Sequence, residues 1–293
     1  LERGEDPQAA LVERGHELGL HVYASVRMND NHFNGTAPAD IPHLHHTEMT
    51  GLRRQHPEWL LGDETEEWYA ASWNMSVPEV REHRFTHLRE ACERYDWDGV
   101  ELDWQRHAFH LPEDDAYRLR YVLTDVQRAA RQLAQRLAAE RGRPFYVAAR
   151  VAGSLEMCRR IGYDIPPWIE EGLVDMLIPA GNAATDPDAE VEQFVDLCRG
   201  TDIVVYPGFD GALAGVPSGP EDATTREQMS VRGIASRHYR AGATGMYAFN
   251  WHAGRDTRRE LLTQVGSPKT LQGTDKIYAA THRFFQKEGE WRG

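Results

Sequence analysis

Six short apolar segments alternate with polar stretches along the chain, and this alternation limits the fold more than any other feature. The segments are residues 20–30, 99–104, 145–153, 173–182, 203–210 and 244–252. Each is rich in β-branched or aromatic residues and is bounded by turn residues, which is typical of buried strands. Regular alternation of such strands with helices predicts a parallel sheet with helices outside it.

The intervals between these segments show the periodicity of amphipathic helices. Apolar residues recur every three or four positions over 119–137 and 191–198, and a similar spacing over 80–92 suggests another helix. Pro78 suits the start of this last helix, where a missing N–H costs nothing. Gly142 suits the end of the long one.

A parallel sheet with helices outside is either an eight-stranded barrel or an open, doubly wound sheet. Nucleotide-binding open sheets carry GxGxxG after the first strand or GxxxxGK[ST], and the chain has neither motif. We therefore predict an α/β fold of the (β/α)8 barrel type, as a single catalytic domain over residues 1–293. Only six strands are visible, so we expect the first two βα units to precede Leu1.

Residues 31–78 form an interval that is too long for an ordinary connection between two elements. The interval is rich in tryptophan and histidine, which argues against disorder. We expect an ordered insertion over the carboxyl-terminal face of the barrel, where barrel active sites are built.

Charge and composition exclude several classes of partner. The 293 residues include 33 basic and 46 acidic side chains, a net charge of −13, which would repel nucleic acid and anionic membranes. No apolar run reaches the ~20 residues of a membrane span. We therefore expect a soluble protein, exported or cytoplasmic, whose oligomeric state stays open.

The chain has three cysteines, Cys92, Cys158 and Cys198. An odd number at wide spacing predicts buried thiols.

Two carboxylates share one face of the second segment. Alternation along the strand turns Val100 and Leu102 toward the helices, so Glu101 and Asp103 point toward the barrel axis. Buried carboxylates must be paired, protonated or functional. Asp103 lies nearer the carboxyl-terminal rim and is the stronger catalytic candidate, and an interior salt-bridge layer is the alternative reading for both.

The same alternation places Arg27 and Arg150 on the inner faces of the first and third segments. We expect both guanidinium groups to approach Glu101 and Asp103. Positive charge at that distance holds a carboxylate ionised and lowers its pKa. An ionised carboxylate suits a nucleophile, whereas a general acid must stay protonated.

The run Asp98-Gly99-Val100-Glu101-Leu102-Asp103 resembles the fourth-strand signature of glycoside-hydrolase barrels. In particular the chain resembles bacterial glycosyl-hydrolase-like proteins of the "family 10-like" type. The similarity continues over residues 19–32, 56–62, 78–84, 172–181 and 265–278. It covers the chain from about residue 6 to 280 and implies that the first visible strand is the third of the barrel.

The resemblance implies a glycosidase with Asp103 as its fourth-strand aspartate. In the wider α-amylase-like group a similar aspartate is the nucleophile, and a histidine follows it by four residues, as His107 does here. The chain departs from that group at Glu101, where arginine is usual. The departure leaves open whether Glu101, Asp103 or both react.

The second catalytic carboxylate has equal candidates in Glu156, after the third segment, and Asp210, at the end of the fifth. Sugars need stacking surfaces and hydrogen-bonding side chains. The residues that we expect to contact a sugar are Arg27, Asn29, Asp30, His32, Trp104, His107, Arg150, Tyr206, Asn250 and His252. Asp30 would orient the loop or bind a hydroxyl.

Three other functions compete with hydrolysis of an oligo- or polysaccharide. One is a carbohydrate-binding barrel without catalysis, and another is a structural module of a larger assembly. The third is a metal-dependent barrel hydrolase or lyase using the run His43-Leu44-His45-His46, or Glu101 and Asp103. Histidine spacing of this kind in a loop is weak support for a metal site, and the sequence implies no organic cofactor.

Overall fold

The chain divides into two compact units, each described by itself. Unit 1 comprises residues 1–149 and 159–175, and unit 2 comprises residues 150–158 and 176–293. A computed structural model describes residues 6–29, 32–65, 67–181, 185, 189–210, 223–251, 254 and 256–278.

The described strands are parallel. They are β1 (Tyr23–Arg27), β2 (Gly99–Asp103), β3 (Tyr146–Val151), β4 (Met176–Pro179), β5 (Val204–Val205), β6 (Gly208–Asp210) and β7 (Tyr247–Phe249). Unit 1 contains the order β1-β2-β3, and unit 2 continues from the last residues of β3 through β4 to β5. In unit 2, β6 pairs with β7 as a separate parallel sheet.

The strand predictions are confirmed, but the closed barrel is not shown. Every predicted segment contains a strand, and the segment 203–210 contains two, β5 and β6. Tyr206 and Pro207 separate these two, and the break leaves β6 paired with β7 instead of continuing the larger sheet. In the part of the chain that the structure describes, the strands therefore form sheets of five and two strands.

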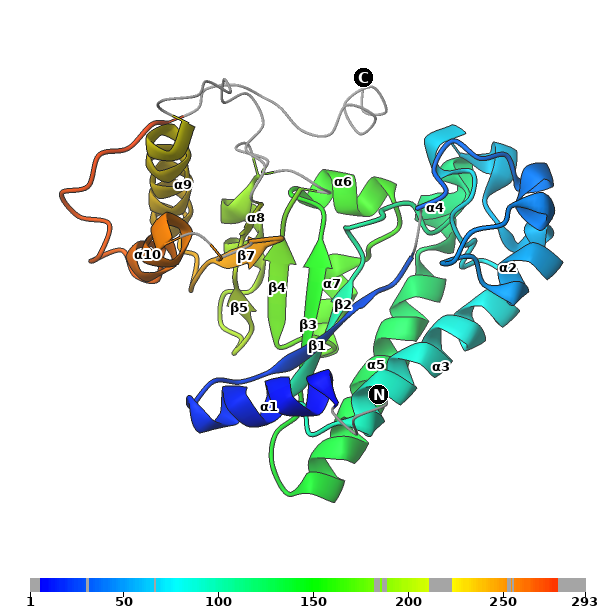
Figure 1. The fold of residues 1–293 in the computed structure, drawn as a ribbon, viewed down its shortest axis with the longest axis horizontal. Helices are drawn as coiled ribbons and strands as arrows, with labels where there is room; N and C mark the ends of the chain where they lie inside the picture. The colour runs from blue at the N-terminus through cyan, green and yellow to red at the C-terminus, as the bar shows by residue number, and fades with distance from the viewer. Residues whose placement is uncertain are drawn as a thin grey trace. The chain divides into compact units, whose positions relative to one another are not determined.

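Helices occupy the intervals between the strands (Figure 1). Unit 1 contains α1 (Pro7–Glu17), α2 (Gly51–Gln55), α3 (Pro78–Arg94), α4 (Ala116–Leu119), α5 (Tyr121–Arg141) and α7 (Ile165–Glu170). Unit 2 contains α8 (Val191–Leu197), α9 (Ala223–Arg240) and α10 (Asp256–Val265), and α6 (Leu155–Arg160) is divided between the units. Short 3₁₀ helices are η1 (Pro38–His43), η2 (Pro57–Trp59), η3 (Gly62–Glu64), η4 (Glu67–Tyr69) and η5 (Glu113–Asp115).

The long helix α5 packs beside α3 in unit 1 (Figure 1). Its predicted apolar stripe is buried, at Val122, Val126, Ala130, Leu133 and Leu137. Gly142 ends the helix with a left-handed φ of 67°, as expected. Just before it, Arg141 donates to the carbonyl oxygens of Cys92 and Tyr95 at the end of α3. The last turns of the two helices are therefore joined by charge-assisted hydrogen bonds.

Short helices make up much of the described part of the insertion 31–78. It contains α2 and η1 to η4, and an antiparallel bridge joins Leu60 to Trp73. Ile41, Leu61 and Met75 are almost fully buried, so the insertion carries apolar packing of its own.

The second sheet of unit 2 is covered by two helices. Phe209 of β6 packs in one cluster with Val231 and Ala235 of α9 and with Leu261 and Val265 of α10. The Tyr239 hydroxyl donates to the Val265 carbonyl oxygen at 2.8 Å, which joins the ends of α9 and α10.

The three cysteines are buried, as predicted. Burial raises the pKa of the Cys92 thiol to about 12 and that of Cys198 to about 11, so neither is a thiolate near neutral pH. None of the described helices is both long enough and apolar enough to cross a membrane.

Gly99 permits the close approach of β1, β2 and β3, which generates a stability prediction. A Cβ there would lie 2.6 Å from the Tyr146 carbonyl oxygen and 2.7 Å from the Tyr23 ring. Gly99→Ala should lower the free energy of unfolding by about 1–3 kcal/mol, because backbone and ring must move to admit the methyl group. Urea denaturation measures the loss.

Gly51→Ala is the matched control, because a Cβ at Gly51 meets only the Gln55 side chain, at 3.7 Å. Its free energy of unfolding should stay within about 1 kcal/mol of the wild-type value. Equal effects of the two substitutions would contradict the close approach at Gly99.

Candidate active site

The register between β1 and β2 brings the predicted site residues of unit 1 together. Ser25 lies opposite Glu101, and Arg27 lies opposite Asp103. Glu101 is 5% exposed, and its Oε1 accepts a hydrogen bond from the Ser25 hydroxyl at 2.9 Å. Glu101 and Asp103 therefore share one face of β2, as alternation predicts.

Asp103 ends β2 and organises the loop that follows it. Its Oδ1 accepts hydrogen bonds from the backbone N–H groups of Gln105 at 3.0 Å and Arg106 at 2.8 Å. The side chain is 1% exposed. Two N–H donors on one carboxylate oxygen stabilise negative charge at the carboxyl end of the strand.

Asp98, at the opposite end of the same motif, has a structural role. It accepts hydrogen bonds from the Val22 N–H at 2.7 Å and the Arg143 guanidinium at 2.5 Å, and its Oδ2 lies 2.9 Å from His16 Nε2. Burial raises the pKa of Asp98, but the Val22, His16 and Arg143 interactions outweigh it and hold this pKa below its usual value. The motif thus holds the sheet at one end and presents carboxylates at the other.

Asn29, just beyond β1, is bonded to two loops. Its Oδ1 accepts from the Trp73 N–H at 3.0 Å, and its Nδ2 donates to the carbonyl oxygens of Trp73 at 3.0 Å and Phe109 at 3.2 Å. The amide group therefore joins the end of the insertion to the loop after β2. Its predicted contact with substrate stays a prediction.

The loop after β2 has an unusual backbone at Phe109, where φ is 70°. Residues other than glycine adopt this conformation rarely, and they do so where the surroundings determine it. The Phe109 ring packs on Tyr69 with centroids 4.3 Å apart, and the Met75 N–H donates to the neighbouring His110 carbonyl oxygen at 2.7 Å. The insertion therefore holds this loop in place above the end of β2.

His32 and His107, both predicted to contact substrate, lie together in unit 1. Their rings meet edge to face with centroids 5.1 Å apart. His107 is buried, whereas His32 is exposed. A histidine pair at the edge of the site offers hydrogen-bonding groups to solvent on the side of His32.

The structure corrects the prediction for Arg27. Its side chain is exposed and forms no ion pair with Glu101 or Asp103 among the described residues. Its carbonyl oxygen accepts from the Arg84 guanidinium. Alternation assigned Arg27 to the same face of β1 as Ser25. That face is open to solvent at the end of the strand, so the guanidinium stays hydrated.

Trp104 is also corrected, because it is a core residue and has no exposed face. It is 0% exposed, its Nε1 donates to Gln127 Oε1 at 3.2 Å, and its ring packs against Tyr163 and Trp168. A tryptophan enclosed in this way offers no stacking surface to a sugar.

The other predicted residues belong to unit 2. Arg150 is 1% exposed, donates to the Gly181 carbonyl oxygen at 2.6 Å and lies 3.8 Å from the centre of the Phe249 ring. Asp210 ends β6 opposite Phe249, and its backbone is bonded to the Thr185 hydroxyl. Asn250 follows β7 with a left-handed φ of 48°. Arg150, Asp210 and Asn250 therefore all lie at the carboxyl ends of unit 2 strands.

Two further candidates lie elsewhere in unit 2, and two are outside the described residues. Glu156 is exposed in the first turn of α6. The Tyr206 ring covers Gly245, where a Cβ would lie 2.4 Å from it. Asp30 and His252 are outside the described residues.

Two cavities lie away from these residues. A cavity of about 590 Å³ lies at the amino end of β2, between α1 and the residues after α3, and one of about 340 Å³ lies beside α9. Neither is lined by a residue predicted from the sequence. Across the described part of the chain, no three histidine, cysteine, aspartate or glutamate side chains are grouped to hold a metal ion.

Comparison with known proteins identifies no family. No protein-family model matches the chain. No curated protein matches it either.

Several solved glycoside hydrolase structures are similar at low identity. The galactosidase domain of an alpha-galactosidase-sucrose kinase is 14% identical, with 90% of this chain and 31% of that one aligned and a TM-score of 0.46. A family 36 alpha-galactosidase from Geobacillus stearothermophilus is 14% identical, with 87% of this chain and 32% of that one aligned and a TM-score of 0.45. A chitinase from Chromobacterium violaceum is 10% identical, with 89% of this chain and 85% of that one aligned and a TM-score of 0.47. The chain spans about a third of the length of the first two, and likeness at this level assigns no reaction to it.

Sequence reasoning missed the buried histidine of this site, His110. It is 0% exposed, and its Nε2 lies 2.9 Å from the Trp104 carbonyl oxygen. Burial lowers the pKa of His110 to about 4, although the Trp104 carbonyl raises it. No spacing pattern marks His110, since its partners are backbone groups and rings brought by the fold.

Removing the Asn29 amide should destabilise unit 1. Asn29→Ala leaves the Trp73 N–H and the Trp73 and Phe109 carbonyl oxygens without this partner in a buried place. We expect the free energy of unfolding to fall by about 2–4 kcal/mol, because unsatisfied buried polar groups cost about 1–3 kcal/mol each. Urea denaturation followed by tryptophan fluorescence measures this fall.

Asn34→Ala is the control, because Asn34 is exposed in a turn of the insertion. Its stability should stay within about 0.5 kcal/mol of the wild-type value. A loss below about 1 kcal/mol for Asn29→Ala would show that water replaces the amide at this position.

His110 makes stability depend on pH. Because its folded pKa is below its unfolded pKa, the unfolded state binds more protons between pH about 6.5 and 4. His110 therefore lowers stability as the pH falls through this window and has no effect above it. His110→Gln should reduce the slope of unfolding free energy against pH there by up to about 1.4 kcal/mol per pH unit.

The matched variant in the pH series is His45→Gln, because His45 is exposed in the insertion whereas His110 is buried. Equal slopes for His110→Gln and the wild type would mean that His110 binds its proton equally in the folded and unfolded states, which would contradict the lowered pKa of His110.

Proposed function

We propose that the chain is a glycoside hydrolase that acts on an oligo- or polysaccharide, with Asp103 as its principal catalytic carboxylate. The observation that carries the proposal is the placement of Asp103 as the last residue of a parallel strand, with its Oδ1 fixed by two backbone N–H groups. Active sites of parallel α/β folds lie at the carboxyl ends of the strands.

Glycoside hydrolysis uses two carboxylates in different roles. A general acid must keep its proton, whereas a nucleophile or general base must be charged. The N–H groups of Gln105 and Arg106 fix one oxygen of Asp103 at the carboxyl end of β2. We assign Asp103 the role of nucleophile or general base, acting through its second oxygen, and the role of general acid to a second carboxylate.

Glu101 is the candidate for that second carboxylate within unit 1. Residues i and i+2 on one strand face are about 6.6 Å apart. That is a spacing of backbone positions, so it places the two side chains next to one another on the face without fixing the separation of their carboxyl groups, which is what distinguishes retaining from inverting enzymes. Glu156 and Asp210 of unit 2 are the alternative partners.

The proposed partner is a carbohydrate, and the proposed domain is a single barrel over residues 1–293. The exposed His32, beside His107, supplies the ring nitrogens that hydrogen-bond sugar hydroxyls. The motif Asp98–Asp103 and the insertion over the end of β2 agree with this assignment, since long loops at strand ends commonly carry binding residues.

The deciding experiment compares glycan hydrolysis by the wild-type chain and its Asp103→Asn variant. Asparagine retains the oxygen that accepts both N–H bonds, so the loop geometry survives while the charge is lost. We expect the rate to fall by at least ~10³, the scale of a catalytic carboxylate. The panel spans aryl glycosides and natural polysaccharides, and circular dichroism checks folding.

Asp114→Asn is the matched control, since Asp114 is exposed in η5, and it should keep the wild-type rate. Parallel Glu101→Gln, Glu156→Gln and Asp210→Asn variants identify the second carboxylate by which one loses activity. NMR of the first-formed anomer then shows inversion or retention. Full activity of Asp103→Asn would remove Asp103 from the chemistry, and a wild type inactive on the whole panel but binding a glycan would favour the non-catalytic alternative.

A further inference from the structure

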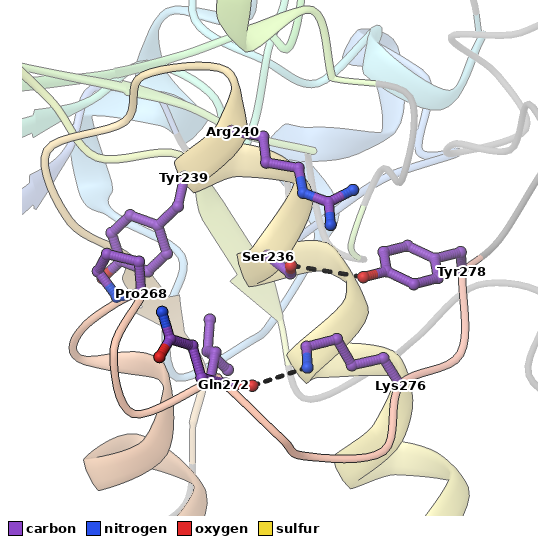
Figure 2. Close-up of a pocket in the computed structure, with 8 residues that line it drawn as sticks. Ser236, Tyr239, Arg240, Pro268, Gln272, Lys276 and Tyr278 are labelled. Carbon is purple, nitrogen blue, oxygen red and sulfur yellow. Dashed lines mark hydrogen bonds between the residues drawn. The ribbon is translucent and has the colours of Figure 1, made fainter.

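A cavity of about 340 Å³ in unit 2 lies beside the carboxyl end of α9, well apart in sequence from Asp103 (Figure 2). Ser236, Tyr239 and Arg240 line it from α9, and Pro268, Leu271, Gln272, Lys276 and Tyr278 line it from the segment after α10. Its volume is at the lower end of the range for small-molecule sites, ~300–1,000 Å³, so it suits a ligand with a single ring.

Local contacts hold the two walls of this cavity together. The Ile277 N–H donates to the Met229 carbonyl oxygen at 3.0 Å, which places the segment against α9. Gly233 permits this approach, because a Cβ there would lie 2.0 Å from the Ile277 carbonyl oxygen. The Tyr278 hydroxyl then reaches Ser236 Oγ at 3.4 Å. The aromatic wall is therefore positioned by backbone contacts.

The charge of the cavity is opposite to that of the whole chain. Arg240 and Lys276 line it, and none of its described lining residues is a carboxylate, although the chain carries a net charge of −13. The local potential therefore favours an anion.

The two cations have different roles. The Lys276 ammonium already donates to the Leu271 carbonyl oxygen at 2.7 Å and to the carbonyl and hydroxyl oxygens of Thr274 at 2.8 and 3.1 Å. Its three protons are used, so it contributes charge only. Arg240 is exposed and makes no hydrogen bond or ion pair with the described residues. Its guanidinium therefore presents a planar fork of N–H donors, which matches a carboxylate.

The rest of the lining combines apolar surface with hydroxyl and amide groups. The Tyr278 ring is 53% exposed, and Leu271 forms a buried apolar floor at 3%. Ser236 and Gln272 add a hydroxyl and an amide group, on opposite sides of the cavity in Figure 2. A sugar ring presents apolar C–H faces and a polar edge of hydroxyls, so it can use both the aromatic and the polar parts of this lining, whereas an aromatic carboxylate would use the aromatic part only.

From these observations we propose that the cavity binds a sugar acid, with its carboxylate on Arg240 and its ring against Tyr278. The two parallel N–H groups of one guanidinium match the two oxygens of a single carboxylate, and inorganic phosphate, which the same fork can pair with, is a competing probe in the test. Binding at this place requires no hydrolysis, so the inference stands or falls independently of the role of Asp103.

The test is calorimetric titration of the full chain with glucuronate and galacturonate, against glucose, galactose, benzoate and inorganic phosphate. We expect at least one uronate to bind about tenfold or more tightly than its neutral counterpart and than benzoate or phosphate. Arg240→Gln should weaken this binding by about tenfold, because it removes the group that pairs with the carboxylate. Tyr278→Ala should weaken it as well, because it removes the ring that packs against the sugar.

Arg259→Gln is the matched control, because Arg259 is an exposed α10 residue paired with Asp256 outside the cavity. It removes the same charge and should leave uronate binding unchanged. Equal binding of charged and neutral sugars, tighter binding of benzoate or phosphate, unchanged binding in Arg240→Gln, or no binding of any probe at millimolar concentration would each overturn the proposal. Hydrolysis assays do not enter this result.

Discussion

The parallel pairing of β1 with β2 is the contact on which the candidate site depends. One register places Ser25 beside Glu101 and brings the end of β1 level with Asp103. A slip of one residue would turn every side chain of β1 to the other face of the sheet. The register is held at its amino end by Asp98, which accepts hydrogen bonds from Val22 and Arg143. The structural role of Asp98 and the catalytic role proposed for Asp103 therefore belong to different residues of the same six-residue run.

Periodicity predicted the elements of the fold well. The six predicted strand segments and the helices α3, α5 and α8 follow from patterns only a few residues long, which tertiary structure did not override. Periodicity could not establish whether the strands close into a barrel, because closure depends on which strands pair with one another across long stretches of sequence. The end of the fifth segment shows this, where Pro207 interrupts the strand and β6 pairs with β7.

Side-chain roles were predicted less well than faces. Alternation gave the shared face of Glu101 and Asp103 correctly, but it could not show that Arg27 is solvated or that Trp104 is enclosed by Tyr163 and Trp168. Both depend on neighbours more than 40 residues away or on open surface. The bonds of Asn29 are equally invisible in sequence, since its partners are backbone groups. The cavity beside α9 was missed for the same reason.

The anchor at Asn29 has a consequence for how this chain can vary. Asn29 and Trp73 are 44 residues apart in sequence and joined by a pair of hydrogen bonds, so the chain on the two sides of most of the insertion is held close together. A segment whose two ends meet can change in length without moving the strands that flank it. The segment between these two residues can therefore be replaced by a loop of different sequence or length. Such a replacement would alter the surface above Asp103 and leave the sheet below it intact.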